Sequence, residues 1–328
     1  MTGAAFADRM RSILINKADM TAPFPSRTTR RRVLGTGLAL GSLALAPARA
    51  ASEWQGATLP QALQREIVSA ITGGRYRILV SVPDGPAPAA GHPVLYALDG
   101  NATFPSLALM ARMAGWRAKA TGQAPPVVVG IGYASERDYD PARGRDYTPR
   151  GGAAPNEGGA DRFLDFIEQE LKPLVRGLAP IDPARQALFG HSYGGLCVLH
   201  ALFTRPASFQ TYLAASPSIW YGERVVLQGV EPFRQRVATL ADKPALMLTV
   251  GELEQPAAKP GAPGSQNPQA AKRRMVEEAG ELAVRLRQMP GALSRVQFHL
   301  LARENHGSAM FPAMARGLEF FVGGGDSV

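Results

Sequence analysis

The feature that most constrains this chain is the segment 187–197, ALFGHSYGGLC, which contains the pentapeptide G-x-S-x-G centred on Ser192. The pentapeptide stands between a short apolar run and an apolar helical pattern. In serine hydrolases this arrangement marks a tight turn that carries the nucleophile between a strand and a helix. We expect a strained backbone at Ser192, and we expect a side chain at Gly190 or Gly194 to strike the neighbouring strand or helix.

The pentapeptide is a weak signal by itself. With 35 glycines in 328 residues, about 0.2 chance matches are expected in a chain of this kind. The context decides, because residues 185–189 are short and apolar enough for a buried strand, and residues 196–202 continue as an apolar helical pattern. The strand, turn and helix that the motif requires are therefore all predicted around Ser192.

The rest of the chain alternates short apolar runs with longer helical patterns. This alternation predicts an α/β fold of one domain, with a mostly parallel central sheet and helices on both faces. The polar and apolar alternation of residues 75–82, followed by Pro83, favours an antiparallel edge strand. The other predicted strands are 94–98, 127–131, 187–190, 245–250 and 296–301, and the predicted helices are 106–118, 161–177, 195–204, 272–289 and 309–321.

The first fifty residues have the pattern of an export signal. Three arginines at 30–32 precede the apolar run 33–46, and Ala-Arg-Ala at 48–50 offers a small-x-small cleavage site. We expect a twin-arginine signal that engages the export machinery and is cleaved after residue 50, with Met20 as an alternative initiator. The alternative is an uncleaved membrane anchor, but an apolar run of about 14 residues is short for a membrane span of roughly 20. No stable membrane insertion is expected after cleavage. The expected location is periplasmic or secreted.

Charge excludes one class of partner. The net charge is +9, but residues 1–50 hold eight basic and two acidic residues, which leaves 28 basic and 25 acidic residues in 51–328. The expected mature domain, 51–328, has no basic tract that could neutralise nucleic-acid phosphates, so nucleic-acid binding is not expected.

The single cysteine, Cys197, cannot form an internal disulfide and is expected in the core. Neither a metal site nor a cofactor is expected.

A serine nucleophile needs a base, and histidine is the residue whose pKa suits that role. Of the five histidines, His306 is the one in a loop after the last predicted strand, where it can reach Ser192. The others precede a strand (His92), lie inside the pentapeptide (His191), or fall in a predicted helix or strand (His200, His299). His306 is therefore the predicted base.

The acid that orients this base is expected after the preceding strand, 245–250. Glu254 is preferred, because it lies three residues beyond Gly251 and the chain can turn back there, and Glu252 is the reserve. If neither carboxylate reaches His306, a Ser-His dyad remains workable but slower.

The oxyanion formed by attack on an ester needs backbone N–H donors. The residue after the nucleophile, Tyr193, is the first expected donor, and Gly100 or Asn101 after the strand 94–98 is the second.

Five motifs occur in order and together resemble a known family. They are YALDGN at 96–101, RDYTP at 145–149, FGHSYGG at 189–195, ASPSIW at 215–220 and NHG at 305–307. The chain resembles the Putative esterase branch of the α/β-hydrolase superfamily, and within it most closely the periplasmic ferric-siderophore esterases of the enterobactin and salmochelin type. The resemblance covers nearly all of residues 60–322.

The resemblance implies an α/β-hydrolase fold and a serine esterase that hydrolyses carboxylic esters through an acyl-enzyme on Ser192, with His306 as base. Some relatives manage with a dyad. The implied small-molecule substrate is a catecholate siderophore trilactone. An acyltransferase, a general carboxylesterase of the same branch and a non-catalytic siderophore-binding protein stay open as alternatives, since the branch also holds S-formylglutathione hydrolases, feruloyl esterases and mycolyl transferases.

Four residues are candidates for substrate binding. Arg143 and Arg145 could pair with an anionic ferric catecholate, and Trp220 and Tyr221 could pack on its rings. The alternative interpretation is a pair of surface arginines and two aromatic residues at the edge of the core.

Overall fold

The computed structural model describes residues 56–152, 154–255 and 272–323. The chain divides into two units, Met1–Gly56 and Ala57–Val328. The predicted export signal and its cleavage site, residues 1–50, lie outside the described residues. The sheet and the site described below belong to the second unit.

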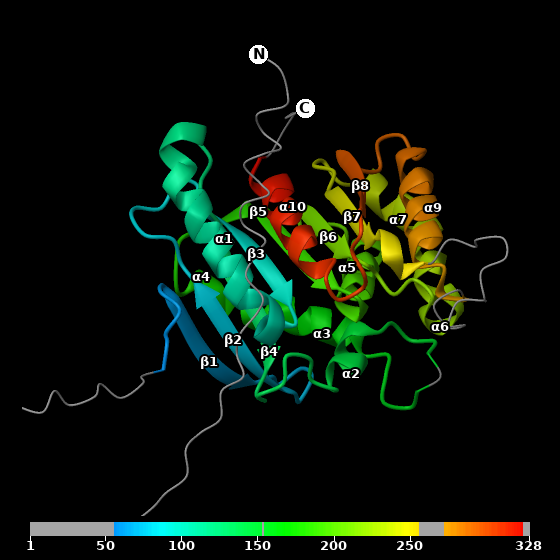
Figure 1. Ribbon diagram of the computed structural model, residues 1–328, viewed down its shortest axis with the longest axis horizontal. Helices are drawn as coiled ribbons and strands as arrows, with labels where there is room; N and C mark the ends of the chain where they lie inside the picture. Colours follow the sequence, from blue (N-terminus) through cyan, green and yellow to red (C-terminus); the bar gives the residue numbers. More distant parts are fainter. Residues whose placement is uncertain (1–55, 153, 256–271, 324–328) are drawn as a thin grey trace, which may run out of the picture. The chain divides into compact units, whose positions relative to one another are not determined.

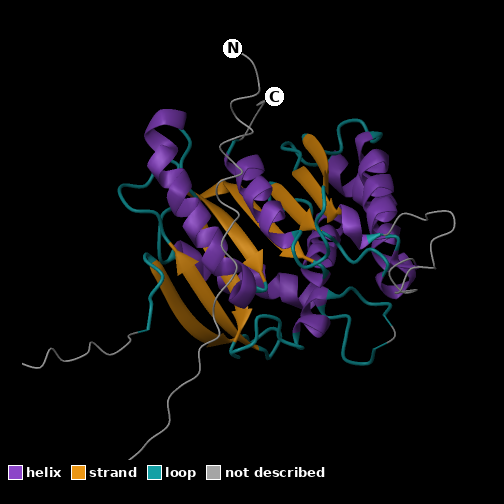
Figure 2. Cartoon of the chain, viewed as in Figure 1, coloured by secondary structure: helices purple, strands orange, loops and turns teal. Residues whose placement is uncertain are grey.

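The second unit is built on one eight-stranded sheet with the order β1-β2-β4-β3-β5-β6-β7-β8 (Figures 1 and 2). The pairs β1–β2 and β2–β4 are antiparallel, and every other pair is parallel. This confirms the predicted mostly parallel sheet. The strands are β1 Ala62–Val68, β2 Arg75–Ser81, β3 His92–Leu98, β4 Val127–Tyr133, β5 Ile181–His191, β6 Thr211–Ala215, β7 Ala245–Gly251 and β8 Arg295–Leu301.

Continuous apolar sequence explains the central strands. All residues of β3, β4 and β7 are buried, as expected for parallel strands that are covered on both faces. The strand β1 has the opposite character, because most of its residues are exposed at the sheet edge. The sheet thus changes from a solvated antiparallel edge to a fully covered parallel centre.

Helices cover both faces of the sheet. The helices α1 and α10 pack on one face, around Phe104, Leu213 and Met314 (Figure 1). The helices α3, α4, α5, α7 and α9 belong to the opposite core cluster, with Phe163 and Phe233. The longer helices are α1 Gly100–Thr121, α5 Tyr193–Thr204, α7 Val230–Ala238, α9 Met275–Arg287 and α10 Met310–Val322. The shorter ones are α2 Arg143–Tyr147, α3 Ala160–Phe166, α4 Lys172–Arg176 and α6 Tyr221–Arg224.

Several elements differ from the sequence predictions. The strand β2 was predicted at the edge of the sheet, but it lies between β1 and β4. The actual edge strand is β1, whose polar and exposed sequence gives no signal of a buried strand, so it was not predicted. The strand β6 was not predicted either, since its five residues are too short to show a period. The single helix predicted over 161–177 is α3 and α4 joined by the π-helical turn η2, Ile167–Leu171.

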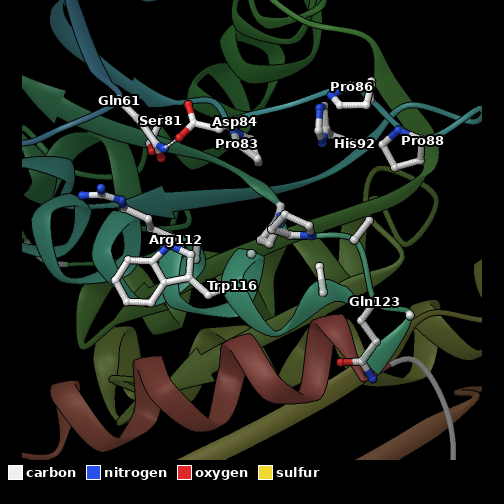
Figure 3. Close-up of a pocket in the computed structure, with 18 residues that line it drawn as sticks. Gln61, Ser81, Pro83, Asp84, Pro86, Pro88, His92, Arg112, Trp116 and Gln123 are labelled. Atoms are coloured by element: carbon white, nitrogen blue, oxygen red, sulfur yellow. Dashed lines mark hydrogen bonds between the residues drawn. The ribbon is translucent and has the colours of Figure 1, made fainter. Parts of the chain in front are cut away.

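A cavity of about 530 Å³ lies at the edge of the sheet where the parallel strands begin (Figure 3). It is lined by His92 at the start of β3, by Trp116 near the end of α1, and by Pro125 before β4. Ser192 follows the opposite, carboxyl end of β5. Within the described ranges, no helix has both the length and the apolar character needed to cross a lipid bilayer.

Candidate active site

The backbone turns sharply at Ser192. The strand β5 ends at His191 and α5 begins at Tyr193, and Ser192 between them has φ 61° and ψ −117°. A non-glycine residue with this conformation is strained, and the hydrogen bond of 3.0 Å from its N–H to the carbonyl oxygen of Ala215 in β6 holds it there. The expected strain at the turn is present.

The glycines around this turn do not play equal roles. A Cβ atom at Gly190 would overlap the carbonyl group of Gly194, as predicted. A Cβ atom at Gly194 would meet its nearest neighbour, Oδ2 of Asp99, at 3.4 Å, which is ordinary contact, so the predicted clash there is wrong. The crowded position is instead Gly195, where a Cβ atom would lie 2.7 Å from the carbonyl oxygen of Ala215.

Three side chains from three loops meet at one edge of the sheet. The Oγ atom of Ser192 lies 3.0 Å from Nε2 of His306, and Nδ1 of His306 lies 2.6 Å from Oε2 of Glu254. These residues follow β5, β8 and β7 respectively. Since the strands are parallel, their carboxyl ends share this edge, and the loops bring together residues that are far apart in sequence.

The carboxylate of Glu254 is buried and fully hydrogen-bonded. Its Oε1 atom accepts hydrogen bonds from the hydroxyl of Ser216 at 2.6 Å and from the N–H of Gly251 at 2.7 Å. Burial alone would raise the pKa of Glu254, but the hydrogen bonds from His306, Ser216 and Gly251 outweigh it and leave that pKa below its ordinary value. The group is therefore an anion that faces the imidazole.

The reserve residue, Glu252, lies elsewhere. Its Oε2 atom accepts a hydrogen bond of 2.8 Å from the backbone N–H of Arg303, and its side chain is exposed. Of the two glutamates, only Glu254 contacts His306 in the described residues. Ser216, which holds Glu254 in place, was not singled out from the sequence, although it lies in the ASPSIW motif.

The other histidines have different partners. His200 in α5 lies 2.8 Å from a carboxylate oxygen of Asp161, and His299 in β8 lies 3.2 Å from the amide oxygen of Gln297. His191 is buried, and its Nε2 lies 2.8 Å from the carbonyl oxygen of His306. His306 is thus the one histidine whose ring contacts the Ser192 hydroxyl among the described residues.

The predicted oxyanion donors stand at two helix starts. Tyr193 is the first residue of α5 and Gly100 the first of α1, so their N–H groups have no partner within the helix. A Cβ atom at Gly100 would lie 2.6 Å from the carbonyl carbon of Gly130, so this position needs glycine. The side chain of Asn101 is occupied, because its Oδ1 accepts from the N–H of Tyr133 at 2.9 Å. Only the backbone of Asn101 is left to act as a donor.

Arg143 is bound to a carboxylate that the sequence did not point to. Its guanidinium makes two hydrogen bonds, of 2.7 and 2.8 Å, to the buried side chain of Asp99. Burial raises the pKa of Asp99, and Arg143 acts in the opposite direction. The guanidinium carbon also lies 5.4 Å from the ring centre of Tyr147 and 5.5 Å from that of Tyr193. Arg143 therefore connects Asp99, just before α1, with Tyr147 in α2 and Tyr193 in α5.

Arg145 is also paired. Its Nε lies 2.7 Å from Oδ1 of Asp146, and both residues line a cavity of about 770 Å³ that also includes Glu157 and Arg162. The charges of Arg143 and Arg145 are thus both balanced by carboxylates within the fold.

The aromatic residues after β6 adjoin the nucleophile. The ring of Tyr193 lies 6.2 Å from that of Trp220 and 5.7 Å from that of Tyr221. Tyr221 is buried, and its hydroxyl donates a hydrogen bond of 2.7 Å to Glu157. Trp220 is only half-buried, and the guanidinium of Arg273 stacks over it at 4.4 Å. Arg273 was missed in the sequence analysis, because it falls in a segment that was predicted only as the start of a helix.

Cys197 in α5 is fully buried, and burial raises the pKa of its thiol. Within residues 56–152, 154–255 and 272–323, no group of three or more His, Cys, Asp or Glu side chains could hold a metal ion.

Comparison with known proteins identifies the family of this chain. The family model described as "Putative esterase" matches residues 69–278. The ferri-bacillibactin esterase BesA of Bacillus subtilis is 36% identical over 274 residues, which cover 80% of this chain and 90% of the relative. The siderophore triacetylfusarinine C esterase of Aspergillus fumigatus is 39% identical over 242 residues, covering 70% of this chain and 81% of the relative.

Solved structures agree with this result. The crystal structure of the BES protein from Bacillus cereus superposes with a TM-score of 0.73 and 35% identity, and it covers 82% of this chain and 98% of that one. The chain therefore belongs to the Putative esterase family, a group of α/β-hydrolases that act on esters.

Proposed function

We propose that this protein is an exported serine esterase that cleaves the carboxylic ester bonds of a siderophore, with Ser192 as nucleophile, His306 as base and Glu254 as the acid that orients the base. The single observation that carries the proposal is the continuous hydrogen-bonded chain from Ser192 through His306 to Glu254, with distances of 3.0 and 2.6 Å. This order of groups is the one that activates a hydroxyl for attack on a carbonyl carbon.

In the first half of the reaction, the Oγ atom of Ser192 bonds to the ester carbonyl carbon while its proton passes to Nε2 of His306. The carboxylate of Glu254 accepts the hydrogen bond from Nδ1–H and stabilises the imidazolium. Collapse of the tetrahedral intermediate breaks the bond to the alcohol, which leaves with the proton from Nε2. The product of this half is an acyl-enzyme on Ser192.

The oxyanion of the tetrahedral intermediate needs N–H donors at the place where its charge develops. The N–H groups of Tyr193 and of Gly100 or Asn101 fill this role in the proposal. The start of α1 lies near the turn, since a Cβ atom at Gly194 would lie 3.4 Å from Oδ2 of Asp99. Each such donor is worth on the order of 100- to 1,000-fold in kcat.

In the second half, water bonds to the acyl carbon while one of its protons passes to Nε2 of His306. Collapse of the second tetrahedral intermediate breaks the bond between the acyl carbon and Oγ of Ser192, and Oγ takes the proton from Nε2 as the carboxylic acid leaves. The side chain of His306 is 46% exposed, so water can reach the base. Because water is the final acceptor, the proposed reaction is a hydrolysis.

The siderophore class is proposed from the relatives, whose printed names describe esterases of ferri-bacillibactin and triacetylfusarinine C. The specific proposal is a catecholate trilactone. Export is proposed from the arginines at 30–32, the apolar run after them and Ala-Arg-Ala at 48–50. N-terminal sequencing of the exported protein tests the cleavage site, and replacing the arginines at 31 and 32 by lysine should retain the precursor inside the cell.

Activity is tested first with p-nitrophenyl butyrate, using the expected mature chain, 51–328, and its Ser192→Ala variant. We expect turnover that falls about 10⁴- to 10⁶-fold in kcat in the variant. Absence of turnover by the unaltered protein, or equal turnover by both proteins, contradicts a serine mechanism on Ser192.

The substrate is tested by following ferric and iron-free enterobactin side by side with a simple aryl ester. Release of linear products from enterobactin with a higher kcat/KM than for the aryl ester supports the siderophore proposal. Recovery of intact enterobactin together with aryl-ester turnover indicates a general carboxylesterase. Ester products formed with an added alcohol indicate an acyltransferase, and binding without any turnover indicates a binding protein.

A further inference from the structure

One cation over the aromatic residues that follow β6 has no carboxylate partner among the described residues. The side chain of Arg273 is exposed, and its guanidinium carbon lies 4.4 Å from the ring centre of Trp220. No ion pair joins Arg273 to a carboxylate in the described part of the chain. In contrast, Arg143 and Arg145 each carry a carboxylate partner.

The position of Arg273 relative to Ser192 follows from two ring contacts. Trp220, under the guanidinium, lies 6.2 Å from the ring of Tyr193, and Tyr193 is the residue after the nucleophile. Burial, followed by the charge of Glu157, raises the pKa of the Tyr193 hydroxyl, and the charges of Arg143 and Arg273 act in the opposite direction. A substrate bound at Ser192 therefore lies within the field of this cation.

Stacking on an indole fixes the plane of a guanidinium and leaves its N–H edges free for other partners. A planar guanidinium can bind a carboxylate or another paired-oxygen anion with two parallel hydrogen bonds. Arg273 lies over Trp220 in this way and has no carboxylate partner among the described residues, so its N–H groups can bind an anion.

Arg143 and Glu157 are the other charged groups that act on Tyr193. Arg143 also acts on Tyr193, but Asp99 neutralises it. Glu157 is the carboxylate that acts on Tyr193, and its Oε2 atom accepts a hydrogen bond of 2.7 Å from Tyr221. Among the described residues, the charges that act on Tyr193 are thus one cation without a carboxylate partner, Arg273, and one carboxylate, Glu157.

We propose that Arg273, stacked on Trp220, is the specificity residue that binds an anionic group of the ester substrate, and that Glu157 opposes the same group. This inference rests on the proposed function, because it assigns the charge of the substrate cleaved at Ser192. Arg273 thus takes the role of pairing with an anionic substrate that was predicted for Arg143 and Arg145, because those two residues already have carboxylate partners. With this role, Arg273 makes the enzyme prefer an anionic ester over a neutral ester of the same reactivity.

The test uses ester pairs that differ only in charge. Mono-(4-nitrophenyl) adipate and suberate carry a free carboxylate on the acyl side, and their methyl-capped forms are neutral. The pair 4-acetoxybenzoate and methyl 4-acetoxybenzoate places the carboxylate on the leaving group instead. The values of kcat and KM are measured for the unaltered protein and for Arg273→Gln, Glu157→Gln and Arg65→Gln.

For Arg273→Gln, we expect kcat/KM to fall about tenfold for at least one anionic ester through a higher KM, since a charge-assisted hydrogen bond is lost. The kcat/KM for the neutral ester should stay within about twofold, because that ester has no charge for Arg273 to bind and the groups at Ser192 are unaltered. Glu157→Gln should act in the opposite direction and raise kcat/KM for the same anionic ester by roughly twofold. Arg65→Gln removes an exposed cation of the edge strand β1 and should leave both esters unchanged.

The dependence of kcat/KM on salt concentration is a second test of the charge of Arg273. In 0.5 M NaCl, the difference between the unaltered protein and Arg273→Gln should shrink for the anionic ester, because salt at about this concentration screens exposed charges within a few ångströms. The neutral ester should show no such change.

The results separate this inference from the proposed function. If no ester is hydrolysed in a Ser192-dependent way, the proposed function fails. If the esters are hydrolysed but Arg273→Gln affects charged and neutral twins equally, or affects neither, the assignment of Arg273 is overturned while the esterase mechanism stands.

Discussion

The Nε2–H of His191 donates a hydrogen bond of 2.8 Å to the backbone carbonyl oxygen of His306, 115 residues further along the chain. The two imidazole rings lie 4.7 Å apart between centres. Burial, followed by the charge of His306, lowers the pKa of His191 to about 4, so His191 is neutral near pH 7. The variable residue of the G-x-S-x-G motif thus anchors the loop that carries the proposed base.

Replacing His191 should change catalysis through the position of His306. We expect His191→Leu to lower kcat about 10- to 100-fold with KM nearly unchanged, since small displacements of a catalytic group are costly. His191→Gln keeps an N–H donor at a similar reach and should stay within about threefold of the unaltered protein. Steady-state kinetics, normalised to active sites titrated with a fluorophosphonate, checks both values. Equal losses in the two variants would argue against the hydrogen bond as the cause.

The lowered pKa of His191 also predicts a pH dependence of stability. Between its ordinary value of 6.5 and about 4, the unfolded chain binds a proton that the folded protein does not bind at His191. The free energy of unfolding should therefore fall as the pH drops through this window, by about 3 kcal/mol in total from this group. The His191→Gln variant lacks this loss, so its Tm should decline less between pH 6.5 and 4.

Thermal unfolding monitored by circular dichroism at several pH values gives this comparison. The carboxylate of Glu254 has a pKa below its ordinary value of 4.5, so its own contribution to stability is lost as the pH falls from about 4.5 through that lowered pKa. That contribution is present in both proteins and cancels in the difference. Parallel Tm curves for the two proteins would contradict the assignment to His191.

The glutamates after β7 should have unequal effects on activity. Glu254→Gln leaves the shape of the side chain but removes the charge that stabilises the imidazolium of His306, and we expect kcat to fall roughly 10³- to 10⁴-fold. Ser216→Ala removes one of two hydrogen bonds to Oε1 of Glu254 and should cost roughly three- to tenfold. Glu252→Gln is the matched control and should change kcat by less than about twofold, because Glu252 bonds to the backbone of Arg303. A larger loss in Glu252→Gln than in Glu254→Gln would reverse the assignment.

The glycines of the turn should differ in tolerance to alanine. Gly190→Ala forces a methyl group onto the carbonyl of Gly194 and should lower the free energy of unfolding by about 3 kcal/mol or more. Gly195→Ala meets the carbonyl oxygen of Ala215 and should also destabilise the fold, by about 2 kcal/mol. Gly194→Ala has ordinary contacts and should stay within about 1 kcal/mol. Urea unfolding of the three variants tests this order, and a Gly194→Ala variant as unstable as Gly190→Ala would disprove it.

Local patterns in the sequence determined the parallel centre of the fold and the turn at Ser192. The runs that became β3, β4 and β7 are apolar throughout, and burial on both faces is the one environment that suits such strands. The strands β1 and β6 escaped prediction, because a polar edge strand and a five-residue strand owe their structure to pairing with neighbours rather than to their own pattern.

Charge and hydrogen-bond partners were decided by tertiary structure. The sequence placed Glu252 and Glu254 on the same loop, but only the path of the chain after β7 gives one of them to His306 and the other to the backbone of Arg303. In the same way, nothing in the residues near Arg143 indicates that Asp99, 44 positions away, neutralises it.

The sequence by itself determined which residue types follow each strand, and hence that a serine, a histidine and a glutamate are available at one edge of the sheet. Only the tertiary structure decided which charges are paired with a carboxylate, like Arg143, and which, like Arg273 over Trp220, have no such partner among the described residues. The physical reason is range: strand and turn preferences act over a few residues, whereas ion pairs and hydrogen bonds depend on distances that the folded chain sets between distant segments.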